Sequence, residues 1–568
     1  MYSGLEWPKR FFGGAFRASD RVHPSAEPDE GRRRASKETV LYEDAAFAFH
    51  SSNEKLCGLQ QKRVDDAWIA VWGTPIPQKG QQVFDEFARV AKGEYSGLKS
   101  LAGSWIAVVY SIASKQLRLV NDCIGTRPVF YCQESSGSRF SFASDVRHLK
   151  DIGNLGTAVN PDVLASWIWY GYNIASTGIL ANAKHMAPGS VLLVDSFGRR
   201  EESPYVTRDD ATCIDSREEL IDCFEQVIGR ACEHALETSS CVNVLLSGGW
   251  DSRYVLAHLL DKGGNAKNLR LTTVDHFGEA ESARNVAQAA GLDVEVLPGT
   301  VYPDDSFEQP FNRTFEGLSF TKHASNLAAK RHPGLPAIQG YLGDSLVRAK
   351  NARRFKLKLN ESMKSREQAA VIAGSLRTIP QGVLRDDVMD EIRERSIDLT
   401  ETILTSRMAG APAQTFDIYG RQRRYIVNNF LQHIETNEVF LPFCSWELVS
   451  HYLYANDDYL NEELYPEMFR KFYPHIGNVP RHKNVVQTGD HVSQTAPEWS
   501  RLSLQMLLSR NTSGFLRKWW LAPRLALAPF RSKQFYAIRS VAAFSMQLEI
   551  ITMLTGNSSF NFRSALQR

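Results

Sequence analysis

Short apolar runs separated by turn residues recur through the first 205 positions of the chain. The run 67–72 ends at a glycine and two prolines, and the runs 105–110 and 117–120 follow one another closely. Runs of this length and spacing predict the strands of packed antiparallel sheets. Further strands are expected over residues 11–16, 129–131, 139–143 and 191–195.

The hydrophobic pattern changes after a polar stretch at 201–215, and we place the boundary between two domains there, 1–205 and 206–568. Beyond it, apolar runs alternate with stretches of helical periodicity. Helices are expected over 217–237, 254–260 and 279–290, and strands over 242–246, 269–274 and 294–297. Alternation at this spacing predicts parallel βαβ units. From about residue 360 onward the chain is expected to be mostly helical.

The hexapeptide SGGWDS follows one predicted strand and opens a predicted helix. Its small residues are Ser247, Gly248, Gly249 and Ser252. The glycines let the backbone approach a phosphate, and the serines add hydroxyl donors. Asp251 would repel a phosphate, so its natural partner is a divalent cation that bridges to phosphates. The motif predicts a pyrophosphate-binding loop, with an ordinary strand-to-helix turn as the alternative.

The length of 568 residues favours two domains. With 43% hydrophobic and 23% charged residues the composition is typical of a soluble globular protein, and the net charge of +2 predicts neither nucleic-acid nor membrane-surface binding. Eight cysteines without a CxxC pair argue against a zinc site and a disulfide framework, and are expected of a protein in the reducing cytoplasm. No apolar run approaches the roughly 20 residues of a membrane-spanning helix.

In this βαβ context, the SGGWDS loop resembles the asparagine synthetase superfamily. Residues 121–131 closely resemble the RDxxGxxPLYY segment of its class II glutamine amidotransferase domain, 142–145 resemble FASE, and 101–107 resemble its glycine-marked strand. Residues 339–345 stand where the superfamily carries GEGxDE. The resemblance implies an α/β protein, with an N-terminal αββα antiparallel sandwich like that of Ntn hydrolases and a C-terminal parallel-sheet PP-loop ATPase domain with added helices.

The same resemblance implies a site for ATP and Mg²⁺ at the carboxyl ends of the parallel strands. Asp251 and Asp344 would be the Mg²⁺ ligands. Lys483 would place a positive charge near the leaving pyrophosphate, with a solvated lysine as the alternative. The residues expected to bind ATP or its pyrophosphate are Ser247, Gly248, Gly249, Asp251, Ser252, Val274 and Gly340.

The first departure from the superfamily concerns the glutaminase nucleophile, which is a cysteine directly after the initiator methionine. Position 2 is Tyr2, Phe12 stands in the cysteine-like place of the first strand, and no cysteine precedes Cys57. Without a nucleophile the hydrolysis of glutamine cannot run. The amidotransferase domain is therefore expected to be structural, with nitrogen supplied by ammonia or by an amine of the substrate.

The second departure is Tyr341, at a place where asparagine synthetase carries a glutamate and the β-lactam synthetase branch carries a tyrosine. With an unperturbed pKa near 10, a tyrosine acts as a base only with help from its neighbours. A tyrosine that simply packs over the nucleotide is the alternative.

Two cationic segments have two interpretations each. The basic run after Asp344 consists of Arg348, Lys350, Arg353, Arg354, Lys356 and Lys358. It is expected to be a solvated helix face, with the reception of an acidic substrate as the alternative. The segment with Trp519, Trp520 and neighbouring arginines is expected to dock on the protein itself rather than on a membrane surface.

Together these residues predict an enzyme, an ATP-dependent carbon–nitrogen ligase that adenylates a carboxylate and couples it to ammonia or an amine. The carboxylate is expected on aspartate, a sugar acid or a peptide, and no nucleic-acid partner is expected; a homodimer is left open. One alternative is a cyclase that resembles β-lactam synthetases or lasso-peptide cyclases. Another is a non-catalytic scaffold with a vestigial nucleotide site.

Overall fold

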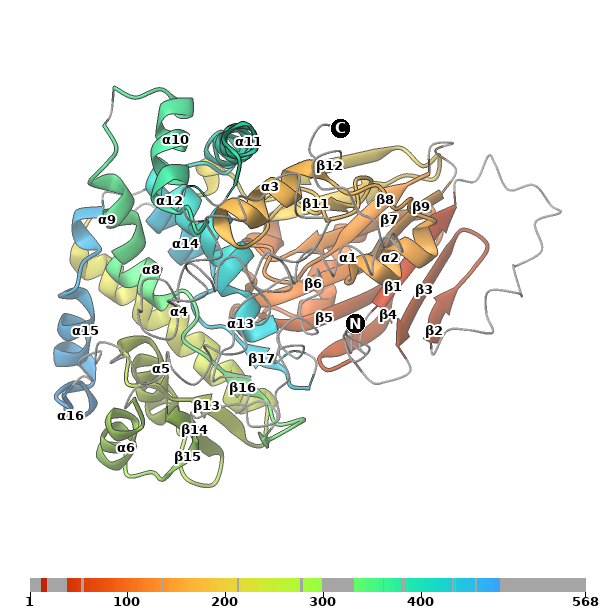
Figure 1. The fold of residues 1–568 in the computed structure, drawn as a ribbon. Helices are drawn as coiled ribbons and strands as arrows, with labels where there is room; N and C mark the ends of the chain where they lie inside the picture. Colours follow the sequence, from red (N-terminus) through yellow and green to blue (C-terminus); the bar gives the residue numbers. More distant parts are fainter. Residues whose placement is uncertain are drawn as a thin grey trace.

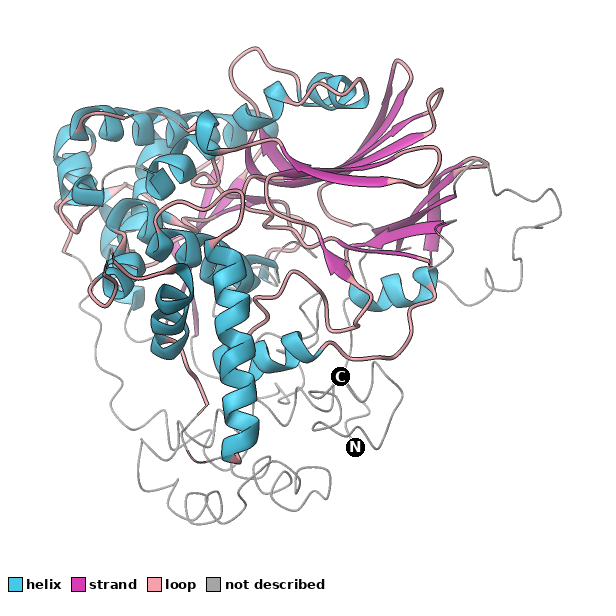
Figure 2. Ribbon diagram, turned by 90° about the horizontal axis from the view of Figure 1, so that it is seen from above, coloured by secondary structure: helices cyan, strands magenta, loops and turns pink. Residues whose placement is uncertain are grey.

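The computed structural model describes residues 12–17, 38–52, 56–134, 137, 139–211, 214–275, 279–298, 331–360, 362–379, 382, 384–431, 434, 436–454 and 457–480. Two antiparallel sheets lie on one side of the molecule, and a parallel sheet with a large group of helices lies on the other (Figure 1). Viewed from above, the separation of helices from antiparallel strands is plain (Figure 2).

Each antiparallel sheet has six strands. The first has the order β10-β8-β9-β1-β3-β2, with β1 Phe12–Arg17, β2 Glu38–Glu43, β3 Phe47–Ser52, β8 Phe130–Gln133, β9 Arg139–Ala143 and β10 Lys184–His185. The second has the order β12-β11-β7-β6-β5-β4, with β4 Leu59–Val64, β5 Ala67–Ile76, β6 Ala102–Ser111, β7 Gln116–Asn121, β11 Ser190–Val194 and β12 Arg200–Pro204. The predicted antiparallel sheets are confirmed.

Aromatic side chains hold the two sheets face to face. Phe49 of β3 lies 5.2 Å from Trp68 of β5, and Phe47 lies 4.8 Å from Tyr110 of β6, measured between ring centroids. Helix α1 (Val83–Ala91) packs on the outer face of the second sheet, and α2 (Val146–Gly153) packs on the first. The N-terminal region is thus a helix–sheet–sheet–helix sandwich with an apolar centre.

The sequence pattern misplaced some features of this region. Strand β5 does not end before Gly73 but continues through Pro75 to Ile76, because beyond Trp72 it pairs only with β6 and forms an edge where a proline is tolerated. The pattern also missed strands β2 to β4 and the helices α1, α2 and α3 (Pro161–Tyr170). The polar stretch at 201–215 begins inside β12 rather than after the sheet.

The parallel sheet has the order β15-β14-β13-β16-β17. Its strands are β13 Val242–Leu245, β14 Leu269–Asp275, β15 Val294–Pro298, β16 Ala337–Ile338 and β17 Val439–Phe440. Helix α4 (Arg217–Thr238) precedes β13, α5 (Trp250–Asp261) joins β13 to β14, and α6 (Glu279–Ala289) joins β14 to β15. The predicted alternation of parallel strands and helices is confirmed; the two short strands β16 and β17 were not predicted, since each has only two residues.

Helices make up most of the described chain after β16, as predicted. They are α8 Gly343–Arg348, α9 Lys350–Lys356, α10 Ser365–Ser375, α11 Asp386–Leu404, α12 Pro412–Thr415, the π-helical segment η4 Phe416–Ile426, α13 Asn428–Leu431, α14 Trp446–Tyr454, α15 Leu464–Phe472 and α16 Pro474–Gly477. Among the described residues, no helix is long and apolar enough to cross a bilayer.

The sandwich and the parallel sheet are joined by backbone and side-chain hydrogen bonds. The Thr74 hydroxyl donates to the Val439 carbonyl at 2.6 Å, and the Gly103 amide donates to the Cys444 carbonyl, also at 2.6 Å. Trp169 of α3 donates to the Ala373 carbonyl in the helical region. The buried apolar residues of the two regions also form one continuous hydrophobic core across this junction.

Candidate functional site

The loop after β13 is closed by its own serines. The hydroxyl of Ser252 accepts a hydrogen bond from the Ser247 amide at 3.0 Å and lies 3.0 Å from the Ser247 hydroxyl. The Ser247 hydroxyl in turn accepts from the Gly249 amide at 3.2 Å. Gly249 precedes the first turn of α5 without a side-chain cap. The amide groups at this end of a twelve-residue helix can therefore bind an anion.

The loop after the neighbouring strand β16 presses against the first loop. A Cβ atom added to Gly340 would lie 2.6 Å from the Asp251 Cβ, and one added to Gly343 would lie 2.6 Å from the Asp251 Cγ. A Cβ atom at Gly340 would also meet the backbone of Asp251 and Ser252, so only glycine fits there, whereas one at Gly343 would meet the ends of the Asp251 and Tyr465 side chains. The contact places Asp344, in the first turn of α8, directly after a residue that touches the Asp251 carboxylate.

This arrangement fits a divalent cation bound together with phosphates. Asp251 and Asp344, in the first turns of α5 and α8, could supply hard oxygen ligands, and phosphate oxygens and water could supply the others. In the described part of the chain, no three His, Cys, Asp or Glu side chains gather into a metal-binding group.

Aromatic residues form a wall beside Asp251 that sequence reasoning did not identify. Trp250 stacks on Tyr465 of α15 at 6.2 Å and lies 5.1 Å from Phe469. Burial, and then the Asp251 carboxylate, raise the pKa of Tyr465 well above its usual value. The spacing of Tyr465 and Phe469, four residues apart on one helix, was the available sequence signal.

Tyr341 belongs to the loop after β16, and its side chain packs inside the protein. Its hydroxyl donates to the Gln422 carbonyl at 2.9 Å, and its ring lies 5.4 Å from Phe430. Burial raises the pKa of Tyr341 well above its ordinary value. To accept a proton as a base, the side chain would have to give up this hydrogen bond. The geometry favours the packing interpretation.

The π-helical segment η4 connects this region to the sandwich. Gln422 donates from its side-chain amide to the Ser345 hydroxyl at 2.7 Å, just after Asp344. The next residue, Arg423, is buried and donates to the Met186 carbonyl at 2.5 Å. Adjacent side chains of one segment thus reach α8, next to Asp344, and the antiparallel sandwich. Long π-helical stretches are rare and are often found at functional sites.

The basic run after Asp344 divides into two groups. Arg348 forms an ion pair with Asp344 and a second with Glu462, and Arg353 lies 3.7 Å from Glu462. The other four side chains are exposed, as a solvated helix face requires: Lys350, Arg354, Lys356 and Lys358. The expectation of a solvated face is therefore wrong for Arg348, which is buried, and holds for the exposed members.

The remaining predicted residues are placed only in part. Val274 is buried near the end of β14, which lies beside β13. Lys483 and the Trp519–Trp520 segment lie outside the described residues. The structure therefore brings together the SGGWDS loop, Gly340 and Asp344, with Val274 on the adjacent strand.

The centre of the sandwich is filled with aromatic rings where the resemblance predicts the glutaminase nucleophile. Phe12 is 1% exposed, and its ring lies 5.4 Å from Trp72 and 5.6 Å from Phe49. Its backbone amide donates to the Ser144 hydroxyl. Phe12 carries neither a nucleophile nor a free α-amine, because eleven residues precede it.

A buried cation lies against the same rings. The guanidinium of Arg127 stacks over Trp72 at 4.5 Å, and its Nε donates to the Ser104 carbonyl at 3.1 Å. Burial lowers the pKa of Arg127 to about 10, and the nearby Asp122 carboxylate opposes the shift. A Cβ atom on Gly73, whose φ is +121°, would meet Arg127 Nε at 2.5 Å. The space beside β5 is therefore occupied by protein.

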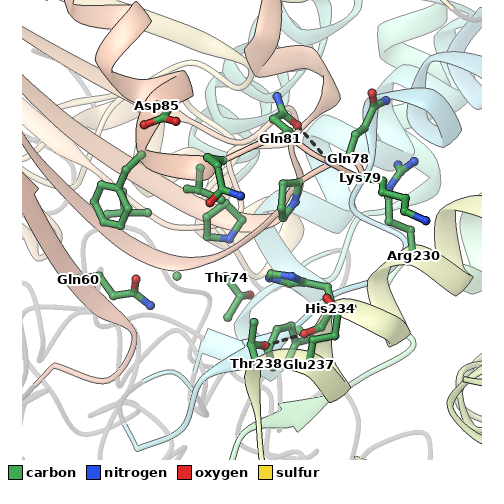
Figure 3. Close-up of a pocket in the computed structure, with 18 of the residues that line it drawn as sticks. Gln60, Thr74, Gln78, Lys79, Gln81, Asp85, Arg230, His234, Glu237 and Thr238 are labelled. Carbon is green, nitrogen blue, oxygen red and sulfur yellow. Dashed lines mark hydrogen bonds between the residues drawn. The ribbon is translucent and has the colours of Figure 1, made fainter. Parts of the chain in front are cut away.

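A separate cavity of about 780 Å³ lies between the sandwich and α4 (Figure 3). Glutamine side chains and Lys79 face it from the sandwich, and Arg230, His234 and Glu237 face it from α4. Burial lowers the pKa of His234. Thr238, at the end of α4 and before β13, also lines it, so the cavity lies toward the amino end of the parallel sheet. The SGGWDS loop lies at the opposite, carboxyl end.

One comparison with known proteins falls in the sandwich. A model of the glutamine amidotransferase domain matches residues 88–206, from within α1 to just beyond β12. Among solved structures, glutamine phosphoribosylpyrophosphate amidotransferase from B. subtilis, complexed with ADP and GMP, shares 11% identity with a TM-score of 0.20, over 60% of this chain and 71% of that chain. No curated protein matches the chain. Residues 88–206 thus form a glutamine amidotransferase-like domain.

Proposed function

We propose that this protein is an ATP- and Mg²⁺-dependent ligase that forms an amide bond, of the asparagine synthetase type, with a PP-loop site after β13. The match of residues 88–206 to a glutamine amidotransferase domain supports amide chemistry in general. The ligase assignment rests on a different part of the chain, the edge of the parallel sheet.

One observation carries the proposal: the loops after β13 and β16 are packed so closely that Gly340 cannot bear a side chain, and Gly343 lies against the Asp251 carboxylate. That packing holds a phosphate-type loop and two carboxylates at one edge of the sheet. An ordinary strand-to-helix turn has no need for a second glycine loop pressed against its aspartate.

The proposed reaction has two steps. An oxygen of the substrate carboxylate attacks the α-phosphorus of ATP, and the bond from that phosphorus to the bridging oxygen of pyrophosphate breaks. An amine nitrogen then attacks the acyl carbon, AMP leaves, and the nitrogen loses a proton. Bound Mg²⁺ would supply charge neutralisation for the phosphates.

The chain's own residues would act mainly by positioning. The amide of Gly248 and amides in the first turn of α5 would bind the pyrophosphate, while the Gly249 amide donates to the Ser247 hydroxyl and shapes the loop. Asp251 and Asp344 would hold the cation, and Lys483 would face the leaving group. Tyr341 would keep the Gly340 loop in place through its hydrogen bond to Gln422.

The nitrogen source in this proposal is not glutamine hydrolysed in the sandwich. Phe12 and Trp72 fill the place where the resemblance predicts the nucleophile. Nitrogen would come from free ammonia or from an amine on the substrate. An amine on the substrate itself would make the protein a cyclase, the second candidate, which the filled sandwich favours.

The test is ATP–pyrophosphate exchange with Mg²⁺ and a panel of amino acids, sugar acids and peptides. Exchange that depends on one carboxylate and is lost in Asp251→Asn is the expected result. Asn is nearly isosteric with Asp, so the loop packing against Gly343 is kept while the charge is removed. A cyclic product without added amine would identify the cyclase. Failure of the whole panel, together with absence of ATP binding, would leave the scaffold alternative.

A further inference from the structure

The carboxylate of Asp344 is already paired with a cation of the chain itself. Arg348, one turn later on α8, forms an ion pair with Asp344 through one guanidinium nitrogen and with Glu462 at 3.1 Å through the other. The Asp344 side chain is 47% exposed, whereas that of Arg348 is only 10% exposed. The cation is thus embedded in the protein and its carboxylate partner faces the solvent.

A second arginine, Arg353, also contacts Arg348. Arg353 donates to the Arg348 carbonyl at 2.5 Å and lies 3.7 Å from the Glu462 carboxylate. Two arginines and two carboxylates therefore form a cluster whose formal charges cancel. Arg348 can lose Asp344 and still keep Glu462, which gives the guanidinium a second place to remain.

A metal ion and a guanidinium that share one carboxylate repel each other in a partly buried site, so each weakens the binding of the other. Arg348 and a divalent cation would therefore compete for the Asp344 carboxylate. The exposed members of the basic run have no such position, since Lys350 and Arg354 point to the solvent-exposed side of α9 and pair with neither Asp344 nor Glu462 among the described residues.

We infer that Arg348 is the resident counter-cation of Asp344 and that it competes with a divalent cation for this carboxylate. The inference rests on the proposed role of Asp344 as a metal ligand. It makes Arg348 a positioning residue that weakens binding of a divalent cation alone. The cation then binds well only with the nucleotide, whose phosphates add the negative charge needed to overcome Arg348.

The test is a titration of the full chain with Mn²⁺, without nucleotide, in which free Mn²⁺ is followed by electron paramagnetic resonance. Arg348→Met removes the charge and keeps most of the buried aliphatic volume. We expect it to bind Mn²⁺ at least fivefold more tightly than the unmodified protein. Arg354→Met is the matched control, because it removes an exposed arginine of the same run, and it should stay within twofold of the unmodified protein.

Arg348→Lys separates the effect of charge from that of altered packing, since it replaces the guanidinium but retains the positive charge. It should stay within twofold of the unmodified protein. Equal tightening in Arg348→Lys and Arg348→Met would overturn the inference, because charge would not be the cause. Unchanged or weaker Mn²⁺ binding in a folded Arg348→Met protein would overturn it too.

Asp344→Asn separates this inference from the proposed function. If Asp344→Asn abolishes binding of the Mg²⁺–ATP complex but Arg348→Met does not tighten Mn²⁺ binding, only the inference fails. If Asp344→Asn leaves Mg²⁺–ATP binding unchanged, the metal assignment itself fails. Tightening in Arg348→Met that is lost in the double variant with Asp344→Asn supports both.

Discussion

The centre of the sandwich and the carboxyl edge of the parallel sheet show opposite solutions at the two places where the resemblance predicts chemistry. At the first, Phe12 and Trp72 pack ring against ring and Arg127 fills the space beside them. At the second, Gly340 and Gly343 allow two loops to pack directly against Asp251. The first region is built as a hydrophobic core, and the second is the site that we propose for the nucleotide.

This difference teaches that a domain match and a working site are separate questions. The matched segment, residues 88–206, contains neither Phe12 nor the loops at the parallel sheet. Asp122, a buried aspartate inside the matched segment, has a structural role. Its carboxylate accepts hydrogen bonds from the Ile124, Gly125 and Thr126 amides and so stabilises a turn.

The largest expected effect is on stability, in the sandwich. Phe12→Ala should leave a cavity between Trp72 and Phe49 and cost about 3–5 kcal/mol in the first unfolding transition. Because Phe12 is far in sequence and in role from the nucleotide loops, binding of ATP by the folded protein should be unchanged. Urea denaturation and calorimetry measure the two quantities. Loss of ATP binding in a folded Phe12→Ala protein would break the proposed division of roles.

The next effect is on the carboxyl edge. Gly340→Ala would place a Cβ atom 2.6 Å from the Asp251 Cβ and 2.9 Å from the Ser252 amide nitrogen, so the two loops must separate. A shift of this kind should weaken Mg²⁺–ATP binding or exchange by about 100-fold. Gly374→Ala is the control, because Gly374 lies in α10 with open space around it. It should leave binding intact and stabilise the helix by about 0.5–1 kcal/mol.

Both regions contain a buried histidine that should respond to pH. Burial lowers the pKa of His148 to about 3 and that of His451 to about 4. Each folded value lies below the unfolded value near 6.5, so the unfolded chain binds more protons as the pH falls, and stability is lost below pH 6.5. Between pH 6.5 and 5 each histidine should cost about 2 kcal/mol.

The measurement is urea denaturation at pH 7 and pH 5 for the unmodified protein and for His148→Gln. The variant should lose about 2 kcal/mol less than the unmodified protein on acidification. An identical loss in both proteins would show that His148 is not buried in its neutral form. His451→Gln provides the same comparison for the helical region.

The smallest expected effect separates a reacting tyrosine from a packing one. Tyr341→Phe removes the donor to the Gln422 carbonyl and should cost about 1 kcal/mol of stability. The exchange rate should change by less than about tenfold, since loss of a general base costs roughly 100-fold or more. A larger fall in rate, with the pH profile of the reaction altered, would assign the proton transfer to Tyr341 after all.

Sequence patterns predicted the parts of this fold that depend on local periodicity. The helix at 217–237 and the strands at 242–246 and 269–274 agree with the structure to within a residue, because each has a strong apolar face and a clear end. The helix α3 was missed even though Asn160, Pro161 and Gly171 are good end signals, because its interior is apolar on all sides and resembles a buried strand.

The candidate site was predictable in its motif residues and not in its partners. The small residues of SGGWDS can be recognised from their spacing in the sequence. Their neighbours Tyr465, Gln422 and Glu462 come from segments far away along the chain, so no local pattern identifies them. Likewise, the ion pair between Asp344 and Arg348 has helical spacing, but only the structure shows that Arg348 is buried.

The most direct test of the central claim is calorimetric titration of the full chain with a nonhydrolysable ATP analogue, with and without Mg²⁺. The account predicts one site per chain that requires Mg²⁺, is lost in Asp251→Asn and is unchanged in Phe12→Ala. Absence of binding, or binding that persists in Asp251→Asn and needs no Mg²⁺, would contradict the assignment of the carboxyl edge as the working site of this protein.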